Sequence, residues 1–420
     1  MIADAALERV LPRRTVVLVG DLVRASLWGA AAVTWLVFIQ IYARMWRLTL
    51  GDPSHSDFTI FYYTVRLVRD GFPMYGASPA PYGITWAADH LGNLNPPHFQ
   101  LLIAPLAAFS YEQAFVIWTA TCGVTLAVWV LIVARTLEIP MTRRRFVGWG
   151  ALIISSAPFT TVAVTSELTF LLMLPFTLCW AAARRGRWWT AGMWLGLCVS
   201  LKLFFLLFIP WLLLRRCWQA IAGVVAASSA ALAAGMVAFG PGVYRDWVAS
   251  LAQVGWWWLP MNASWHGFVS RTLQGSETIK PLIAGAALVE PLVLCGAAVV
   301  SVLTVHGAYR LGRGERDIDL AFLLLLLGAI LSSPLGWVYY LPLAVAPLLG
   351  VLWNGTWRAL SRVTLSAVVV LATGFYVPQE EAASGQPSAL MTITVASAYF
   401  WALAATWTGA LTLSRRVAGS

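Results

Sequence analysis

A short acidic and aromatic segment, His55-Ser56-Asp57-Phe58, follows the first long apolar run of the chain. Two tyrosines, Tyr62 and Tyr63, come shortly after it. A carboxylate beside apolar and aromatic side chains has a raised pKa, which suits it to accept a proton near neutral pH. We therefore predict that Asp57 acts as a general base on an acceptor hydroxyl, with His55 and Tyr62 among the residues that bind substrate.

The same carboxylate has a structural interpretation. Asp is a favoured helix N-cap, and residues 58–68 have a helical pattern. The two interpretations are compatible, because a cap also fixes the position of the carboxylate. Three acids of the same loop, Asp52, Asp70 and Asp89, are rival candidates for the base.

Two further polar segments lie at the edges of apolar runs. In Asn95-Pro96-Pro97-His98, the prolines predict an extended entry into a short helix. Asn95 and His98 are candidates for substrate binding, although His98 is also explained as an interfacial side chain. Glu167 lies in a short turn between two apolar runs, where it is either an ordinary solvated residue or a polar ligand that faces a cavity.

Lys202 is a single lysine between two short apolar stretches. A charged residue at that depth is costly, and it usually faces the interior of a helical bundle or a wet cavity. The candidate role of Lys202 is to neutralise a lipid-linked phosphate. The alternative is a side chain that extends along the bilayer to reach its interface.

Two late segments carry the remaining candidates. The tryptophan-rich segment 256–271 contains Asn262, and its His266 and Arg271 could hold a phosphate, Arg through paired hydrogen bonds. An amphipathic helix on the membrane surface explains the tryptophans equally well. Segment 332–340 is most simply a turn, from which Trp337 and Tyr339 could reach the same cavity.

The composition of the chain indicates which class of fold positions these residues. Hydrophobic residues make up 60% of the 420 residues, charged residues only 11%, and mean hydropathy is +0.74. A soluble domain contains about 25% charged residues. The sequence therefore predicts an all-α, polytopic transmembrane helical bundle that forms a single domain, 1–420.

The expected spans are the apolar runs of the sequence. They lie at about 26–43, 113–134, 147–165, 168–183, 218–239, 283–306, 320–332, 335–353, 363–377 and 390–413. Residues 98–109 are too short to span and are expected to form a partial span. Residues 190–214 are expected to form a hairpin that enters the membrane and returns at Lys202. We expect about 10–12 membrane helices, including short re-entrant ones.

Basic residues indicate the orientation of these helices. With the spans above, twenty of the 28 Lys and Arg residues fall on one side, which the positive-inside rule assigns to the cytoplasm. Both termini are then cytoplasmic, and the loops 44–98 and 240–281 are extracytoplasmic. The net charge of +10 is explained by this topology and implies no nucleic-acid partner. We expect a multi-pass protein of the plasma (inner) membrane.

These motifs, in this order, resemble glycosyltransferase family 87, which consists of GT-C-type membrane enzymes. The matching landmarks are Asp57 with Tyr62-Tyr63, Asn95-Pro96-Pro97, Ser166-Glu167, Arg184-Arg185-Gly186-Arg187, Gly196 to Lys202, Asn262 with Ser264 and Arg271, and Ser333-Pro334 with Trp337. The chain also departs from the family pattern. The turn often contains Gly-Gln where this chain has Ser166-Glu167, the lysine is often followed by a proline-containing segment, and a histidine is common where this chain has Tyr339.

The resemblance implies a transferase that moves a hexose, with mannose the expected sugar, from a polyprenyl-phosphate donor to a lipid or glycan acceptor on the outer face, with inversion. Asp57 matches the catalytic base of the family. We expect no cofactor and leave a metal requirement open. A lipid-linked glycan ligase or polymerase, and a lipid or sugar transporter, are the alternatives.

Overall fold

Helices form nearly all regular structure in residues 13–53, 56–76, 80–82, 92–276, 279–354 and 388–417, which are the residues that this computed structural model describes. Across these residues the only β-type pairing is an isolated bridge between Asn262 and Trp337. The all-α fold class predicted from the sequence is therefore confirmed.

Five helical segments in this part of the chain are long and apolar enough to cross a membrane. They are Ala25–Gly51 within α2 (Arg13–Gly51), α5 (Tyr111–Thr136), α11 (Trp218–Phe239), Ala286–Tyr309, which includes α14 (Val289–Tyr309), and Ala389–Val417, which ends in α20 (Ala398–Val417). The chain is thus a multi-pass membrane protein, as its composition predicts.

Shorter helices complete the bundle. The predicted run 147–165 is a bent pair, α6 (Arg143–Ser155) and α7 (Ala157–Thr165), whose axes differ by 69° at Ser156. Shorter apolar helices are α8 (Thr169–Arg184), α9 (Trp188–Leu201), Leu203–Leu214 with α10 (Phe208–Leu214), and Val338–Trp353, which consists of η7 (Val338–Ala344) and α16 (Val345–Trp353). The predicted span 363–377 lies outside the described residues.

Helix α15 (Glu315–Ser332) forms the centre of the bundle. All residues from Ile318 to Leu331 are buried, including the leucine run 323–327. A helix that is apolar on every side is expected to be surrounded by protein, and α15 contacts α8, α14, α16 and α20. This helix ends at the loop that carries Trp337.

The predicted hairpin around Lys202 is also present. Helix α9 ends at Leu201, Lys202 has extended backbone, and a 3-10 turn begins at Leu203. Helix α9 packs closely on α11, because Gly192 brings its backbone against Ala220: a Cβ at Gly192 would lie 2.1 Å from the Ala220 carbonyl oxygen. Small residues permit such close contact between membrane helices.

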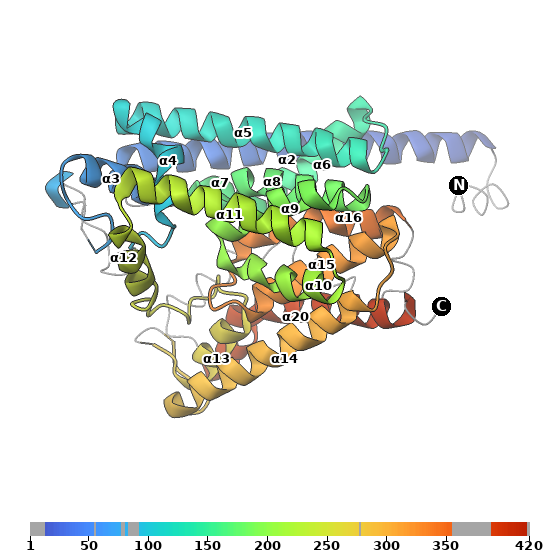
Figure 1. Ribbon diagram of the computed structural model, residues 1–420. Helices are drawn as coiled ribbons and strands as arrows, with labels where there is room; N and C mark the ends of the chain where they lie inside the picture. Colours follow the sequence, from blue (N-terminus) through green and yellow to red (C-terminus); the bar gives the residue numbers. More distant parts are fainter. Residues whose placement is uncertain are drawn as a thin grey trace.

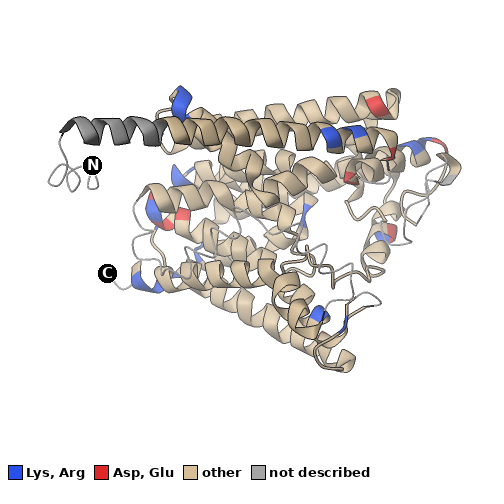
Figure 2. Cartoon of the chain, turned by 180° about the vertical axis from the view of Figure 1, so that it is seen from behind, with Lys and Arg blue, Asp and Glu red and all other residues tan. Residues whose placement is uncertain are grey.

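The two ends of the bundle differ in character. The start of α2 and the end of α20 lie at one end, which we call the terminal end (Figure 1). Helices α3 (Asp57–Arg69) and α12 (Gly242–Leu251) lie at the opposite end, which we call the loop end (Figure 1). Figure 2 shows Lys and Arg at both ends, whereas most of the coloured Asp and Glu residues lie at the loop end.

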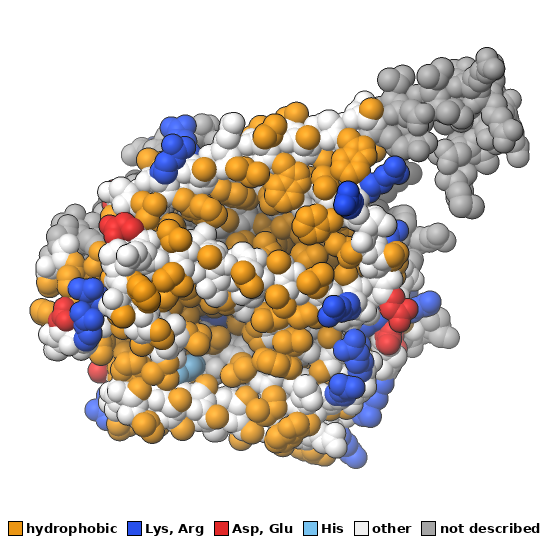
Figure 3. All heavy atoms as spheres, turned by 90° about the horizontal axis from the view of Figure 1, so that it is seen from above, with side chains coloured by type: hydrophobic (Ala, Val, Ile, Leu, Met, Phe, Trp, Pro, Cys, Tyr) orange, Lys and Arg blue, Asp and Glu red, His pale blue; other side chains and the backbone are white. Residues whose placement is uncertain are grey.

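Between these ends the surface is apolar. Figure 3 shows one face on which hydrophobic side chains cover the centre and charged side chains gather towards two edges. Exposed large hydrophobic residues on α2, α5 and α14 include Leu36, Val124 and Val302, each more than 60% exposed. This is the surface expected of a bundle whose middle contacts lipid.

Candidate active site

A cavity of about 390 Å³ lies at the loop end. Its wall is assembled from six separate parts of the chain: the start of α3, residues 92–95, the turn between α7 and α8, the α9–α10 hairpin, α12 with the following loop, and residues 333–340. Six predicted site residues line it, and these are Asp57, Asn95, Glu167, Lys202, Trp337 and Tyr339.

Asp57 is the first residue of α3 and not its N-cap. The cap is Ser56, whose hydroxyl oxygen accepts a hydrogen bond from the Phe58 backbone N–H at 3.2 Å. The same hydroxyl donates to the Thr165 carbonyl at 3.0 Å. Ser56 thereby joins the start of α3 to the end of α7, and it brings Asp57 beside the turn that carries Glu167.

Glu167 is buried, so its interpretation as a solvated turn residue is wrong. The turn contains Ser166 in the left-handed conformation (φ 55°, ψ 36°), which is uncommon outside glycine. One carboxylate oxygen of Glu167 accepts hydrogen bonds from the Thr169 N–H at 2.7 Å and hydroxyl at 2.5 Å. The other oxygen lies 3.3 Å from the Lys202 ammonium.

Lys202 reaches into the cavity and does not extend to an interface. Its ammonium pairs with Glu167, donates to the Asn95 side-chain oxygen at 3.2 Å, and lies 5.3 Å from the centre of the Tyr340 ring. The break between α9 and the next turn is what allows the lysine to point out of the helix axis at this depth. Irregular backbone within a bundle is tolerated where it lines such a cavity.

The environment of Asp57 changes its acidity. Burial, together with the negative charge of Glu167, raises the pKa of Asp57 to about 7, and the Lys202 ammonium opposes the rise. Desolvation disfavours the charged carboxylate, and a like charge nearby acts in the same direction. A carboxyl group with this pKa is close to half ionised at neutral pH. A general base works best when its pKa lies near the working pH.

Aromatic rings form another part of the cavity wall. The rings of Trp256 and Trp337 stack with their centres 5.4 Å apart, and Trp337 stacks on Tyr339 at 5.9 Å. Tyr340, which touches Lys202, also packs on Phe204 with ring centres 5.0 Å apart. Flat apolar faces thus line the cavity together with the charged groups, an arrangement that suits a ligand with both polar and apolar parts.

Asn262 lies behind this wall and holds it together. Its side-chain nitrogen donates to the Trp257 and Pro334 carbonyls, both at 3.0 Å. Its oxygen accepts from the N–H groups of Ser264 (3.1 Å) and Gly336 (3.0 Å). Asn262 is fully buried and uses its whole hydrogen-bonding capacity. It therefore joins the tryptophan-rich loop to the loop that carries Trp337.

Arg271 and His266 also lie behind the cavity wall. The fully buried Arg271 guanidinium donates to the Leu259 and Asn262 carbonyls at 2.8 and 3.1 Å and to the Ser397 hydroxyl at 3.0 Å. Burial lowers its pKa to about 9. The His266 ring stacks on Trp257, with centres 4.5 Å apart. Neither side chain is part of the cavity lining, although Trp257 is.

Tyr62 and His98 also lie outside the cavity lining. The Tyr62 hydroxyl donates to the Phe109 carbonyl at 2.7 Å. His98 is buried and not interfacial; its Nδ1 lies 3.1 Å from the Tyr244 hydroxyl, and burial lowers its pKa to about 4. Tyr62 thus links α3 to the segment before α5, and His98 links the segment after Asn95 to α12.

The rival acids are less well placed than Asp57. Asp70 is exposed and accepts a hydrogen bond from the Tyr82 hydroxyl at 2.5 Å, and Asp52 is also exposed. Neither lines the cavity. The predicted substrate-binding residue His55 and the rival Asp89 lie outside the described residues.

Two lining residues had no signal in the sequence. Trp247 comes from α12, where its indole N–H donates to the Leu94 carbonyl at 3.0 Å. Phe204 comes from the turn after Lys202. Trp247 lies outside the tryptophan-rich segment 256–271, and a single phenylalanine in an apolar run resembles every other core residue.

Comparison with known proteins identifies the family of this chain. The profile of glycosyltransferase family 87 matches residues 93–335, more than half of the chain. The chain is also 25% identical over 373 residues to a "Polyprenol-phosphate-mannose-dependent alpha-(1-2)-phosphatidylinositol mannoside mannosyltransferase" of Mycobacterium tuberculosis, an alignment that covers 83% of this chain and 82% of that protein. The match favours a transferase over the ligase and transporter alternatives, and the chain belongs to glycosyltransferase family 87.

Proposed function

We propose that this membrane glycosyltransferase moves a mannosyl group from a polyprenyl-phosphate donor to a hydroxyl of a lipid or glycan acceptor, with inversion. The observation that carries the proposal is the position of Asp57, a carboxyl group with a pKa of about 7 in the wall of a cavity that also contains Lys202. The activity of the mycobacterial relative, which uses polyprenol-phosphate-mannose, supports the donor class.

The reaction is a single displacement. Asp57 accepts the proton of the acceptor hydroxyl while the oxygen attacks the anomeric carbon, and the bond from that carbon to the phosphate oxygen breaks. Polyprenyl phosphate leaves with the bonding electrons, and a new glycosidic bond forms. A phosphate is a stable leaving group, so the mechanism needs no second carboxylic acid to protonate it.

Lys202 is proposed to bind the donor phosphate. It is the one cationic side chain among the described residues that line the cavity. Its contacts with Glu167, Asn95 and Tyr340 hold the ammonium in a fixed position. The stacked rings of Trp256, Trp337 and Tyr339 would pack against the apolar face of the sugar.

The other predicted site residues are proposed to act through these groups. Asn262 and Arg271 bind the backbone of the tryptophan-rich loop, and His266 supports Trp257 from behind. In the same way, Tyr62 holds α3 against the segment before α5, and His98 holds the segment after Asn95 against α12. They position the wall and do not touch substrate.

The cavity is proposed to face the extracytoplasmic side, with the twenty basic residues identified above in the cytoplasm. A cysteine at the exposed position Gln253 tests this orientation, because it follows α12 at the loop end. A membrane-impermeant maleimide added to intact cells should label Gln253→Cys. Labelling that requires broken cells would reverse the proposed orientation.

The assay that tests the function uses purified protein in detergent. The protein is incubated with synthetic polyprenyl-phosphate mannose and, separately, polyprenyl-phosphate glucose, each together with a membrane lipid extract. Mass spectrometry should detect an acceptor that has gained one hexose, with the mannose donor preferred. Absence of any hexose transfer from either donor would contradict the proposal.

The acidity of Asp57 gives a pH prediction. A general base must be ionised, so kcat/KM should fall about tenfold per pH unit below pH 7 and level off above it. Because the negative charge of Glu167 raises the pKa of Asp57, Glu167→Gln should move the midpoint of this acidic limb to lower pH. A pH–rate profile of the two proteins measures both effects. An identical midpoint would show that Glu167 does not act on the base.

A further inference from the structure

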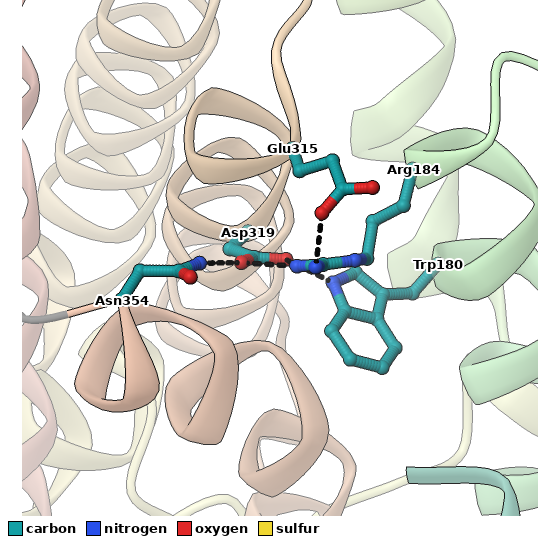
Figure 4. A network of polar contacts seen from close by, with 5 residues as sticks. All are labelled: Trp180, Arg184, Glu315, Asp319 and Asn354. Atoms are coloured by element: carbon teal, nitrogen blue, oxygen red, sulfur yellow. Dashed lines mark hydrogen bonds and ion pairs between the residues drawn. The ribbon is translucent and has the colours of Figure 1, made fainter. Parts of the chain in front are cut away.

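A second polar cluster lies inside the bundle, away from the cavity (Figure 4). One guanidinium nitrogen of Arg184, the last residue of α8, donates to both carboxylate oxygens of Asp319 in α15. Trp180 and Asn354 each donate a further hydrogen bond to Asp319 at 2.8 Å. The second terminal nitrogen of Arg184, Nη2, lies 2.7 Å from a carboxylate oxygen of Glu315.

The Arg184–Asp319 pair of this cluster is almost completely removed from solvent, whereas the Glu315 side chain is 62% exposed. Asp319 is fully buried, and the Arg184 side chain is 5% exposed and lies over the Trp180 ring. A buried ion pair costs much of its attraction in lost hydration, so it is a poor source of stability compared with apolar residues of the same volume. The best-attested use of such groups is to specify one alignment of neighbouring helices.

The backbone of α16 approaches the same carboxylate. A Cβ at Gly350 would lie 2.5 Å from the Asp319 carboxyl carbon, so only glycine fits without displacement. Asn354, at the end of α16, binds Asp319 through its side chain. The cluster thus fixes the positions of α8, α15 and α16 with respect to one another.

Each of these three helices leads to the cavity at its other end. Helix α8 begins two residues after Glu167, and at 1.5 Å per residue its 16 residues span about 24 Å. Helix α15 ends at Ser332, just before the loop to Trp337. Helix α16 continues from η7, which begins beside Tyr339 and Tyr340. A shift of any helix along its axis would therefore move one part of the cavity wall.

We propose that the Arg184–Asp319 pair, with Gly350, is a positioning device that sets the axial alignment of α8, α15 and α16, and through it the mutual positions of Glu167, Trp337 and Tyr340. The inference rests on the proposed function of the cavity. Its residues are positioning residues, because they touch neither substrate nor the reacting atoms.

The test separates alignment from stability. In the double variant Arg184→Met/Asp319→Leu, apolar side chains of similar volume replace the pair, so the protein should still fold. We expect its thermal unfolding midpoint to stay near that of the wild type, kcat to fall at least tenfold with little change in KM, and the midpoint of the acidic limb to move, because Glu167 shifts relative to Asp57.

A second variant keeps the charges and changes only the spacing. Gly350→Ala adds a methyl group against Asp319 and should also lower kcat at least tenfold and move the acidic limb. The matched control is Gly148→Ala in α6, where a Cβ meets nothing within 4 Å and activity should not change. Gly350→Ala remains informative if the double variant fails to fold.

The outcomes are distinct. A folded double variant, or Gly350→Ala, with unchanged kcat and an unchanged pH midpoint would overturn the positioning role. A fall in the amount of folded protein with an unaltered pH profile would assign the cluster to stability alone, which also overturns it. Failure of the proposed function would show in the wild-type protein, as an absence of hexose transfer.

Discussion

Replacing Asp57 with asparagine is expected to lower kcat by roughly 10²–10⁴-fold, the usual contribution of a general base. Asparagine has nearly the same shape but cannot accept the proton of the acceptor hydroxyl. The Ser56 cap, which does not involve the Asp57 side chain, remains, so α3 should start at the same residue. Steady-state transfer from polyprenyl-phosphate mannose measures the change.

Two further measurements make this result specific. Asp57→Asn should bind the donor about as well as the wild type does. This binding is measured as the shift in the thermal unfolding midpoint when donor is added. Asp70→Asn is the matched control, because Asp70 caps the other end of α3 and is exposed and outside the cavity. Substantial turnover by Asp57→Asn would exclude Asp57 as the base.

Loss of Lys202 has the second largest expected effect. Lys202→Met removes the cation proposed to bind the donor phosphate, and a hydrogen bond to a charged group is worth about 1.5–3 kcal/mol, or roughly 10- to 150-fold in kcat/KM. The ammonium also opposes the rise in the pKa of Asp57. The acidic limb of the pH–rate profile should therefore move to higher pH, opposite to the effect of Glu167→Gln.

The control for this variant separates loss of donor binding from loss of the ion pair with Glu167. Removal of Lys202 alone leaves the buried Glu167 carboxylate without its ion pair, and a buried unpaired charge destabilises a protein by about 3–5 kcal/mol. The double variant Lys202→Met/Glu167→Gln restores the charge balance and should recover thermal stability without recovering kcat/KM. Recovery of both would assign Lys202 to folding and not to donor binding.

The sequence was most informative where a single residue contradicted its surroundings. Lys202 interrupts an apolar run, and this predicted a break in the helix, which the structure contains. The sequence left two directions open for its side chain, and in the structure that side chain lines the cavity. Asp57 was selected in the same way, from a carboxylate among aromatic residues. The helical membrane class followed from composition, because no soluble core could bury so much apolar surface.

The roles of the other polar residues depend on tertiary contacts, which the sequence does not show. Arg271 and Lys202 are both single cations in apolar surroundings, yet one binds backbone carbonyls and the other lines the cavity. Nothing local distinguishes them, since the acceptors of Arg271 come from a folded loop. Arg184 was interpreted from the sequence as a topology signal, because its partner Asp319 lies 135 residues away. Charge counts cannot show which basic residue is buried.

The ion pair in the cavity also bears on how the protein resides in a bilayer. Lys202 and Glu167 cancel each other, and a carboxyl group with a pKa of about 7 carries only half a charge at neutral pH. The cavity lining is thus close to electroneutral, so assembling it next to lipid tails incurs little of the Born energy that an isolated ion would.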